Sequence, residues 1–243
     1  MRTRVGRLAC APGGRPSPVA SLVVAGLLVG GSSAFAQTPA GLLEAANNAD
    51  PVSSAAAQYS LGIMYDLGAG VPEDNAAAAR WYQLAAVQGN AHAQFSLGFL
   101  YATGAGVPKD NAAAVRWYRL AAAQGNAGAQ YNLGDKYKNG AGVLKDNAAA
   151  VRWYRLAAAQ GNARAQGSLG LMYATGAGVP KNMERAYMWF SLEVAGQSAA
   201  DRDIAVINRD RASEDLTPEQ LSRAQAQATT CFNSNFTDCG EPD

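Results

Sequence analysis

Apolar residues in the middle of this chain recur at intervals of three and four, and the whole pattern returns after 36 residues. In the clearest copy, residues 93–126, one face has the spacing i, i+4, i+7 and i+8 and consists of Ala93, Leu97, Leu100 and Tyr101. A second face, with the spacing i, i+3, i+4 and i+7, consists of Ala114, Trp117, Tyr118 and Ala121. Both spacings are typical of amphipathic helices. Each copy is therefore predicted to be a pair of helices, A and B.

Glycine and short polar residues mark where these helices are expected to begin and end. Helix A is followed by Gly104-Ala105-Gly106, and glycine adopts the positive φ of a helix C-terminus without a Cβ clash. Helix B is expected to stop at Gly125, so that Asn126 caps the next helix A. The acids expected to open helix B are Asp74, Asp110 and Asp146.

The period extends over four copies. Glycine recurs inside helix A at Gly62, Gly98, Gly134 and Gly170, and tryptophan recurs in helix B at Trp81, Trp117, Trp153 and Trp189. A period of this length is typical of a solenoid, whose units bury their apolar faces against one another. Glycine inside a helix costs about 1 kcal/mol relative to alanine. We therefore expect the backbone of a neighbouring helix to approach these glycines closely, and we expect Trp117 and Trp153 to be core wedges between helices.

The first two copies follow the text A-Q-x-x-L-G-x-x-Y-x-x-G-x-G-V-P-x-D, then A-x-x-W-Y, then A-A-x-Q-G-N; the third has Leu144 in place of the proline, and the fourth departs from it at the aspartate and after Trp189. This text resembles the Sel1-like repeat, a relative of the tetratricopeptide repeat, and the resemblance covers residues 53–196. It implies an all-α fold, namely a right-handed superhelical α-solenoid of helix-turn-helix repeats whose concave side is lined mainly by helix A. It also implies a scaffold or adaptor that binds proteins or peptides.

Residues 1–36 have the pattern of a signal peptide. Four arginines precede the apolar run 19–29, and Ala34-Phe35-Ala36 is a small-x-small cleavage signal. We expect cleavage before Gln37. The alternative is an uncleaved membrane anchor, but the run is shorter than the roughly 20 residues needed to span a bilayer. The expected location is the periplasm or the medium, with membrane contact only through an uncleaved leader.

The segments that flank the repeats are expected to cap the stack. Residues 37–52 contain a candidate helix at 41–48, and residues 197–230 contain two more, at about 199–210 and from the capping box at 217–220 to about 228. Such caps keep the terminal apolar faces of a solenoid out of water. In the tail, 231–243, Cys231 and Cys239 are the only cysteines after the leader. In an exported chain this pair is expected to form a disulfide.

Charge excludes one class of partner and suggests where another binds. The chain has 20 Lys plus Arg and 19 Asp plus Glu, and the leader removes four bases and no acids, which leaves sixteen against nineteen, or −3. A net acidic chain is not expected to bind nucleic acid, which requires clustered bases. Eight bases face three acids within residues 91–163, whereas acids dominate on both sides. The middle repeats therefore form a basic belt.

The third copy departs from the others inside this belt. Asp135-Lys136 stands where the other copies have two apolar residues. One account is that the Lys136 stem packs while its ammonium reaches water at the edge, with Asp135 as its neighbour. The other account is a cationic contact for a ligand. A buried charge must be solvated or paired in either case.

An aromatic row is the candidate binding surface. Tyr59, Phe95 and Tyr131 recur on helix A with Ser60, Ser96 and Asn132 beside them, and the row lapses at Gly167. These rings either complete the packing between helices or line a groove. In the second case the row would anchor an extended peptide through Tyr59, Phe95 and Tyr131. Asn132 would bind the peptide backbone. An acidic peptide would be favoured by Lys136 and Lys138.

Catalytic and metal sites are not indicated. No Ser-x-x-Lys pair is present, and the single histidine, His92, leaves no convincing Ser-His-Asp site. We expect His92 to be a solvated surface residue, and we expect no cofactor or metal. The sequence thus predicts an exported, non-catalytic scaffold for a protein or peptide partner in the cell envelope. The alternatives are an envelope hydrolase or β-lactam-interacting enzyme, and a purely structural envelope component.

Overall fold

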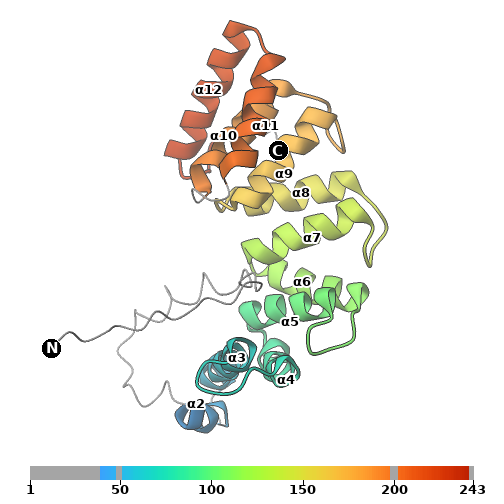
Figure 1. The fold of residues 1–243 in the computed structure, drawn as a ribbon, viewed down its shortest axis with the longest axis vertical. Helices are drawn as coiled ribbons and strands as arrows, with labels where there is room; N and C mark the ends of the chain where they lie inside the picture. Colours follow the sequence, from blue (N-terminus) through green and yellow to red (C-terminus); the bar gives the residue numbers. More distant parts are fainter. Residues whose placement is uncertain (1–38, 48–50, 198–201, 241–243) are drawn as a thin grey trace, which may run out of the picture.

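The computed structural model describes residues 39–47, 51–197 and 202–240, in which all regular structure is helical. The eleven helices of these residues succeed one another along an elongated stack (Figure 1). Their bounds are α2 Pro39–Ala46, α3 Pro51–Leu67, α4 Asn75–Val87, α5 Ala91–Thr103, α6 Asn111–Ala123, α7 Ala127–Asn139, α8 Asn147–Ala158, α9 Ala163–Thr175, α10 Met183–Gly196, α11 Arg202–Glu214 and α12 Pro218–Asn233. The predicted leader, residues 1–36, lies outside the described residues.

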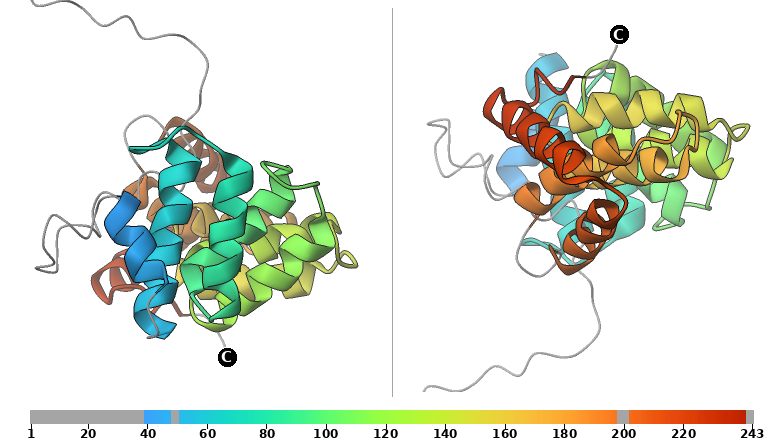
Figure 2. Two further views of the ribbon diagram at one scale, coloured as in Figure 1. Left: turned by 90° about the horizontal axis from the view of Figure 1, so that it is seen from below. Right: turned by 90° about the horizontal axis from the view of Figure 1, so that it is seen from above.

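The repeats stack as predicted. Helices A are α3, α5, α7 and α9, and each packs against its own helix B, which is α4, α6, α8 or α10. Each of the first three helices B also packs against the helix A that follows it, so the pairs form a continuous solenoid (Figures 1 and 2). The predicted all-α solenoid is confirmed.

The predicted ends of the repeat helices are confirmed, whereas the two C-terminal helices end later than predicted, at Glu214 and Asn233. Asp110 caps α6, its Oδ1 accepting from the backbone N–H groups of Ala112 and Ala113 at 2.8 and 2.9 Å. Asn126 caps α7 in the same way, accepting from Ala129 N at 2.8 Å. At the other end of α5, Gly104 has φ +84°, the left-handed conformation that favours glycine. Short-range capping therefore fixes where each helix starts and stops.

The expectation for the glycines inside helix A was only partly right about what they contact. A Cβ at Gly98 would lie 3.3 Å from the backbone oxygen of Ala114 in helix B, but only 2.7 Å from the ring of Tyr118. A Cβ at Gly134 would lie 2.6 Å from the ring of Tyr154. These glycines mainly make room for a buried ring of helix B. The closest backbone contact occurs in the loops between A and B, where a Cβ at Gly142 would collide with the backbone of Asn111, the first residue of the preceding helix B.

The buried rings of the core are tyrosines more than tryptophans. Tyr82, Tyr118 and Tyr154 are 0–1% exposed. Trp117 and Trp153 each pack against the core cluster formed by the preceding helix B and the helix A of their own repeat, but they are only half-buried. They are boundary residues between repeats, so the expectation that they are core wedges was only partly right. In the fourth repeat Trp189 is buried at 2% exposure.

A ladder of buried glutamines ties the repeats together. Gln94 Nε2 donates to Ala86 O at 3.0 Å, and Gln124 Nε2 donates to Gln94 Oε1 at 2.8 Å. The same bonds recur one repeat later around Gln130. Gln94, on α5, therefore links the C-terminal end of α4 to the C-terminal end of α6. Gln130, on α7, links α6 to α8 in the same way.

The two ends of the stack are closed by the flanking helices. At the start of the stack, α2 packs against α3. It spans 39–46, two residues earlier than the predicted range of 41–48. At the other end, α11 and α12 pack against α10 and cover the top of the stack (Figure 2). The capping box is present: Gln220 N donates to Thr217 Oγ1, and Thr217 N donates to Gln220 Oε1.

The predicted disulfide is present, but its position relative to the last helix differs from the expectation. Cys231 and Cys239 are bonded. Both were expected to follow the final helix, yet α12 continues to Asn233, so Cys231 lies inside its last turn. Cys231 is fully buried against the core of the fourth repeat. The bond therefore ties the C-terminal tail to the cap.

Candidate protein-binding surface

The predicted aromatic row exists and is part of the packing between helices. Tyr59, Phe95 and Tyr131 are half-buried on successive helices A. Each ring lies near the buried tyrosine of its own helix B, with ring centroids 5.8, 6.1 and 5.9 Å apart. These rings thus close the packing of each repeat while keeping one part open to solvent.

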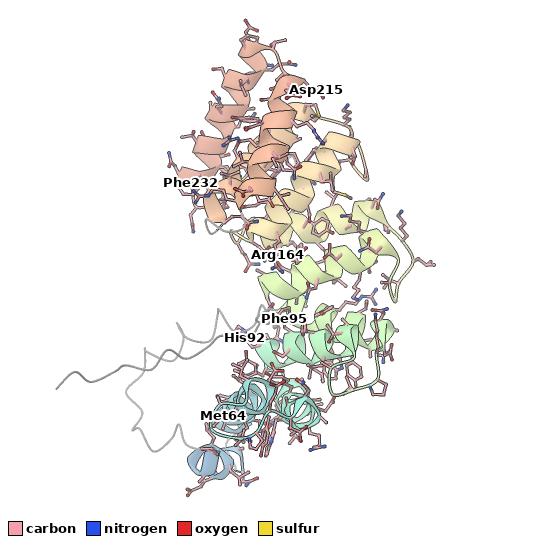
Figure 3. The ribbon with its side chains drawn as sticks, viewed as in Figure 1. Met64, His92, Phe95, Arg164, Asp215 and Phe232 are labelled. Carbon is pink, nitrogen blue, oxygen red and sulfur yellow. A yellow bond between two sulfur atoms is a disulfide. The ribbon has the colours of Figure 1, made fainter. Side chains whose placement is uncertain are left out.

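The first two rings of the row also reach the start of the next helix A. Tyr59 stacks on His92 with centroids 5.8 Å apart, and a Cβ at Gly128 would lie 3.1 Å from the ring of Phe95. Figure 3 shows His92, Phe95 and Arg164 on the same side of the stack. His92 is exposed, as expected, but it is also a stacking partner, which the sequence did not indicate.

The row ends at Gly167 because another side chain takes the space. The carboxylate of Glu193, from α10, lies where a side chain at Gly167 would begin. Burial raises the pKa of Glu193 above its usual range, and its Oε2 is buried without a hydrogen-bond partner. The fourth repeat therefore replaces an aromatic ring with a half-buried acid.

Tyrosine hydroxyls from helices B reach polar residues of helices A. Tyr154 donates to Asp135 Oδ1 at 2.6 Å, and Tyr82 donates to Asp66 Oδ2 at 3.3 Å. Burial raises the pKa of both hydroxyls well above the usual range. Burial, with a smaller contribution from Asp135, also raises the pKa of Tyr131 to about 12. The hydroxyls of Tyr82 and Tyr154 therefore stay protonated as donors even at a pH at which an exposed tyrosine ionises.

Lys136 is held by a partner that the sequence did not suggest. Its Nζ donates to Oδ1 of Asn111, on α6, at 2.7 Å. Asp135, the expected neighbour, accepts instead from Tyr154. Burial lowers the pKa of Lys136, and the nearby Lys109 lowers it further. The half-buried ammonium of Lys136 is thus fixed in place.

A pocket of about 260 Å³ lies between α5 and α7 beside this lysine. It is lined by Phe99, Ala102, Thr103, Tyr118, Asn132, Asp135, Lys136, Asn139 and Ala141. Of the six predicted binding residues, Asn132 and Lys136 line it, whereas Tyr59, Phe95 and Tyr131 form the row and Lys138 is half-buried elsewhere on α7. Phe99 and Asn139 were missed, although Asn139 replaces a threonine of the second and fourth copies.

The described residues contain no group of three or more His, Cys, Asp or Glu side chains arranged to hold a metal ion. In the same part of the chain, no helix is long and apolar enough to cross a bilayer.

Comparison with known proteins gives one family and a set of similar solved structures that includes the following two. The model of the Sel1 repeat matches residues 55–90, 91–126, 127–162 and 163–192. A Sel1 repeat protein from Oxalobacter formigenes is 32% identical with a TM-score of 0.62, over 84% of this chain and 76% of that one. A protective antigen of uropathogenic Escherichia coli with an SLR fold is 33% identical with a TM-score of 0.58, over 79% of this chain. The match spans only 44% of that antigen. No curated protein matches the chain.

Proposed function

Because this chain belongs to the Sel1 repeat family, we propose that it is an exported, non-catalytic scaffold of the cell envelope that binds an extended acidic peptide of a partner protein. The observation that carries the proposal is the pocket between α5 and α7, which joins a fixed ammonium to side-chain amides beside a row of open aromatic edges. Aromatic anchors surrounded by hydrogen-bonding groups are the usual composition of an interface hot spot.

The charges around the pocket favour an acidic ligand. Lys136 lines the pocket and Lys109 lies close enough to it to affect its pKa. Asp135 also lines the pocket, and its negative charge is offset by Lys136, with Lys109 nearby. The Oδ1 of Asp135 accepts a hydrogen bond from Tyr154. A peptide carboxylate would gain a charge-assisted hydrogen bond from Lys136, which is worth more than a neutral one. The amides of Asn132 and Asn139 would bind the peptide backbone.

Export is supported by the cleavage pattern of residues 1–36 and by the disulfide between Cys231 and Cys239. Structural disulfides persist in oxidising compartments and are rare in the cytosol.

The experiment is a pull-down from envelope extract with the mature chain, followed by binding measurements with the recovered partner. The double variant Tyr131→Ala, Asn132→Ala should weaken binding at least about tenfold with unchanged helicity. The matched control is Tyr59→Ala, Ser60→Ala, which truncates the equivalent positions of the first repeat, away from the lysines. Unchanged binding by the Tyr131 variant would remove the helix A surface from the site.

A further inference from the structure

A second surface of the repeats has the chemistry of an interface, and it lies on helices B. In α4, α6 and α8 an arginine, a tryptophan and a leucine recur at i, i+1 and i+4. These nine residues, called the outer strip here, are Arg80, Trp81, Leu84, Arg116, Trp117, Leu120, Arg152, Trp153 and Leu156. The three leucines are 46, 50 and 50% exposed, the arginines are exposed and the tryptophans are half-buried.

The outer strip faces away from the pocket. Tyr118 lines the pocket from α6 and is buried. Leu120 follows it by two residues, and two residues of an α-helix point about 200° apart. Arg116 precedes Tyr118 by the same number. The strip and the pocket are therefore on opposite sides of helix B, so both surfaces are open at the same time.

In the fourth repeat, the positions equivalent to the outer strip are covered by other helices of the same chain. On α10, the residues equivalent to the strip's arginine and leucine are Met188 and Leu192, and they are 1 and 2% exposed. They share a core cluster with Ala212 of α11 and with Ala228 of α12. Helices of this chain thus bury on the fourth repeat what the first three repeats leave exposed.

Charge identifies the kind of helix that would fit the first three repeats. The sequences of α4, α6 and α8 contain five arginines and no acid. Arg119 is already hydrogen-bonded to Tyr137, but Arg80, Arg116 and Arg152 extend into solvent beside the leucines. Since α11 and α12 each carry as many bases as acids, the cap helices of a second copy do not complement this charge.

We propose that the outer strip is a docking surface for an acidic amphipathic helix of a second protein. Its apolar side would cover the leucines and the open faces of the tryptophans, as the cap helices cover Met188 and Leu192. Its carboxylates would pair with the guanidinium groups, whose planar fork suits bidentate binding of a carboxylate. Tryptophan and arginine are the residues most enriched in interface hot spots. With a peptide in the pocket, the chain would join two partners.

The test is site-specific photo-crosslinking of the full chain in the cells that produce it. A benzophenone amino acid replaces Leu120 in one variant and Leu144 in a control, because Leu144 is 90% exposed but lies in a loop outside the strip. We expect an adduct at position 120 that is absent at position 144. Sequencing of the adduct should give a segment with apolar residues at helical spacing flanked by Asp and Glu.

Charge reversal then separates docking from chance proximity. Arg116→Glu with Arg152→Glu should reduce the adduct at position 120 at least about tenfold, because a pairing becomes a repulsion. Arg202→Glu with Arg211→Glu, both exposed on α11, is the control for net charge, and circular dichroism checks the folding of each variant. The pocket variant Tyr131→Ala, Asn132→Ala should leave the adduct unchanged. No adduct, an adduct with lipid or with a second copy of this chain, or an adduct unaffected by charge reversal would overturn the proposal.

Discussion

Gln160 donates a 2.7 Å hydrogen bond from its Nε2 to Oε1 of Gln130, thirty residues earlier in the chain. Gln130 is 4% exposed and donates in turn to the carbonyl of Ala122 at 3.2 Å. A single buried amide thereby connects helices of consecutive repeats. In the fourth repeat Gly196 stands at the position of Gln160, and Oε1 of Gln166 is buried without a partner.

The missing inter-repeat bond at Gln166 gives a prediction about stability. Gln130→Leu should lower the free energy of unfolding by about 1–3 kcal/mol, because it removes both hydrogen bonds of a buried amide. Gln166→Leu is the matched control, since it removes only the 3.4 Å bond to Ala158 O. We expect its cost to be smaller by about 1 kcal/mol or more. Chemical denaturation measures both, and equal costs would show that the inter-repeat bond contributes nothing.

The loop glycines give a prediction about backbone contact. Gly142 and Gly125 both have positive φ, +79° and +86°, but a Cβ at Gly142 would meet the backbone of Asn111, whereas a Cβ at Gly125 has nothing within 4 Å. Alanine at either position pays about 1–2 kcal/mol for the left-handed conformation. Gly142→Ala should cost about a further 1–3 kcal/mol for overpacking. Thermal unfolding of the two variants tests this difference, and it fails if their melting temperatures coincide.

The sequence predicted the helix pairs and their ends because these depend on neighbours within a few residues. Asn126 and Asp110 cap their helices through residues two or three positions ahead, so these bonds do not depend on how the repeats stack. Which aromatic ring is buried depends instead on contacts between helices. Trp117 and Tyr118 are adjacent in the chain, and it is the packing of α6 against α5 that buries the ring of Tyr118 over Gly98. Periodicity placed both on one face, and we expected the tryptophan to be the core residue.

The candidate site was predicted only in outline for a similar reason. The departure of the third repeat at Lys136 was visible in the sequence, but its partner Asn111 is 25 residues away and belongs to another repeat. The buried glutamines were missed because amides are usually exposed. The signal that could have found them is the recurrence of Gln58 with Gln88, Gln94 with Gln124, and Gln130 with Gln160 at one fixed separation.

Export predicts the chemical state of the purified protein. Protein recovered from the periplasm or the medium should begin at Gln37 by N-terminal sequencing. Denatured without reductant, it should show no reactive thiol, because Cys10 leaves with the leader and the other two cysteines are bonded. The double variant Cys231→Ser, Cys239→Ser should lose about 2–3 kcal/mol of stability. A thiol that reacts in the unmodified protein, or a retained Met1, contradicts the processing that we propose.

Glu193 predicts how stability changes with pH. Burial raises the pKa of its carboxyl group above the usual value of about 4.3. Between the unfolded and the folded pKa the native state binds more protons than the unfolded state, so this group makes stability fall as pH rises through that window. Above the folded pKa the charged group is a constant penalty. Glu193→Gln should therefore raise the melting temperature at pH 7, and the gain should shrink as the pH approaches 4.

The control for this prediction is Glu184→Gln, in the same helix. Glu184 accepts both hydrogen bonds from the guanidinium of Arg223, at 2.7 and 3.2 Å, so its neutral replacement should lower or leave unchanged the melting temperature at pH 7. Melting temperatures measured at several pH values between 4 and 8 distinguish the two variants. If Glu193→Gln is less stable than the unmodified protein at pH 7, the carboxylate over Gly167 is not a buried penalty, and it would have to be paired with a cation that stabilises its charge.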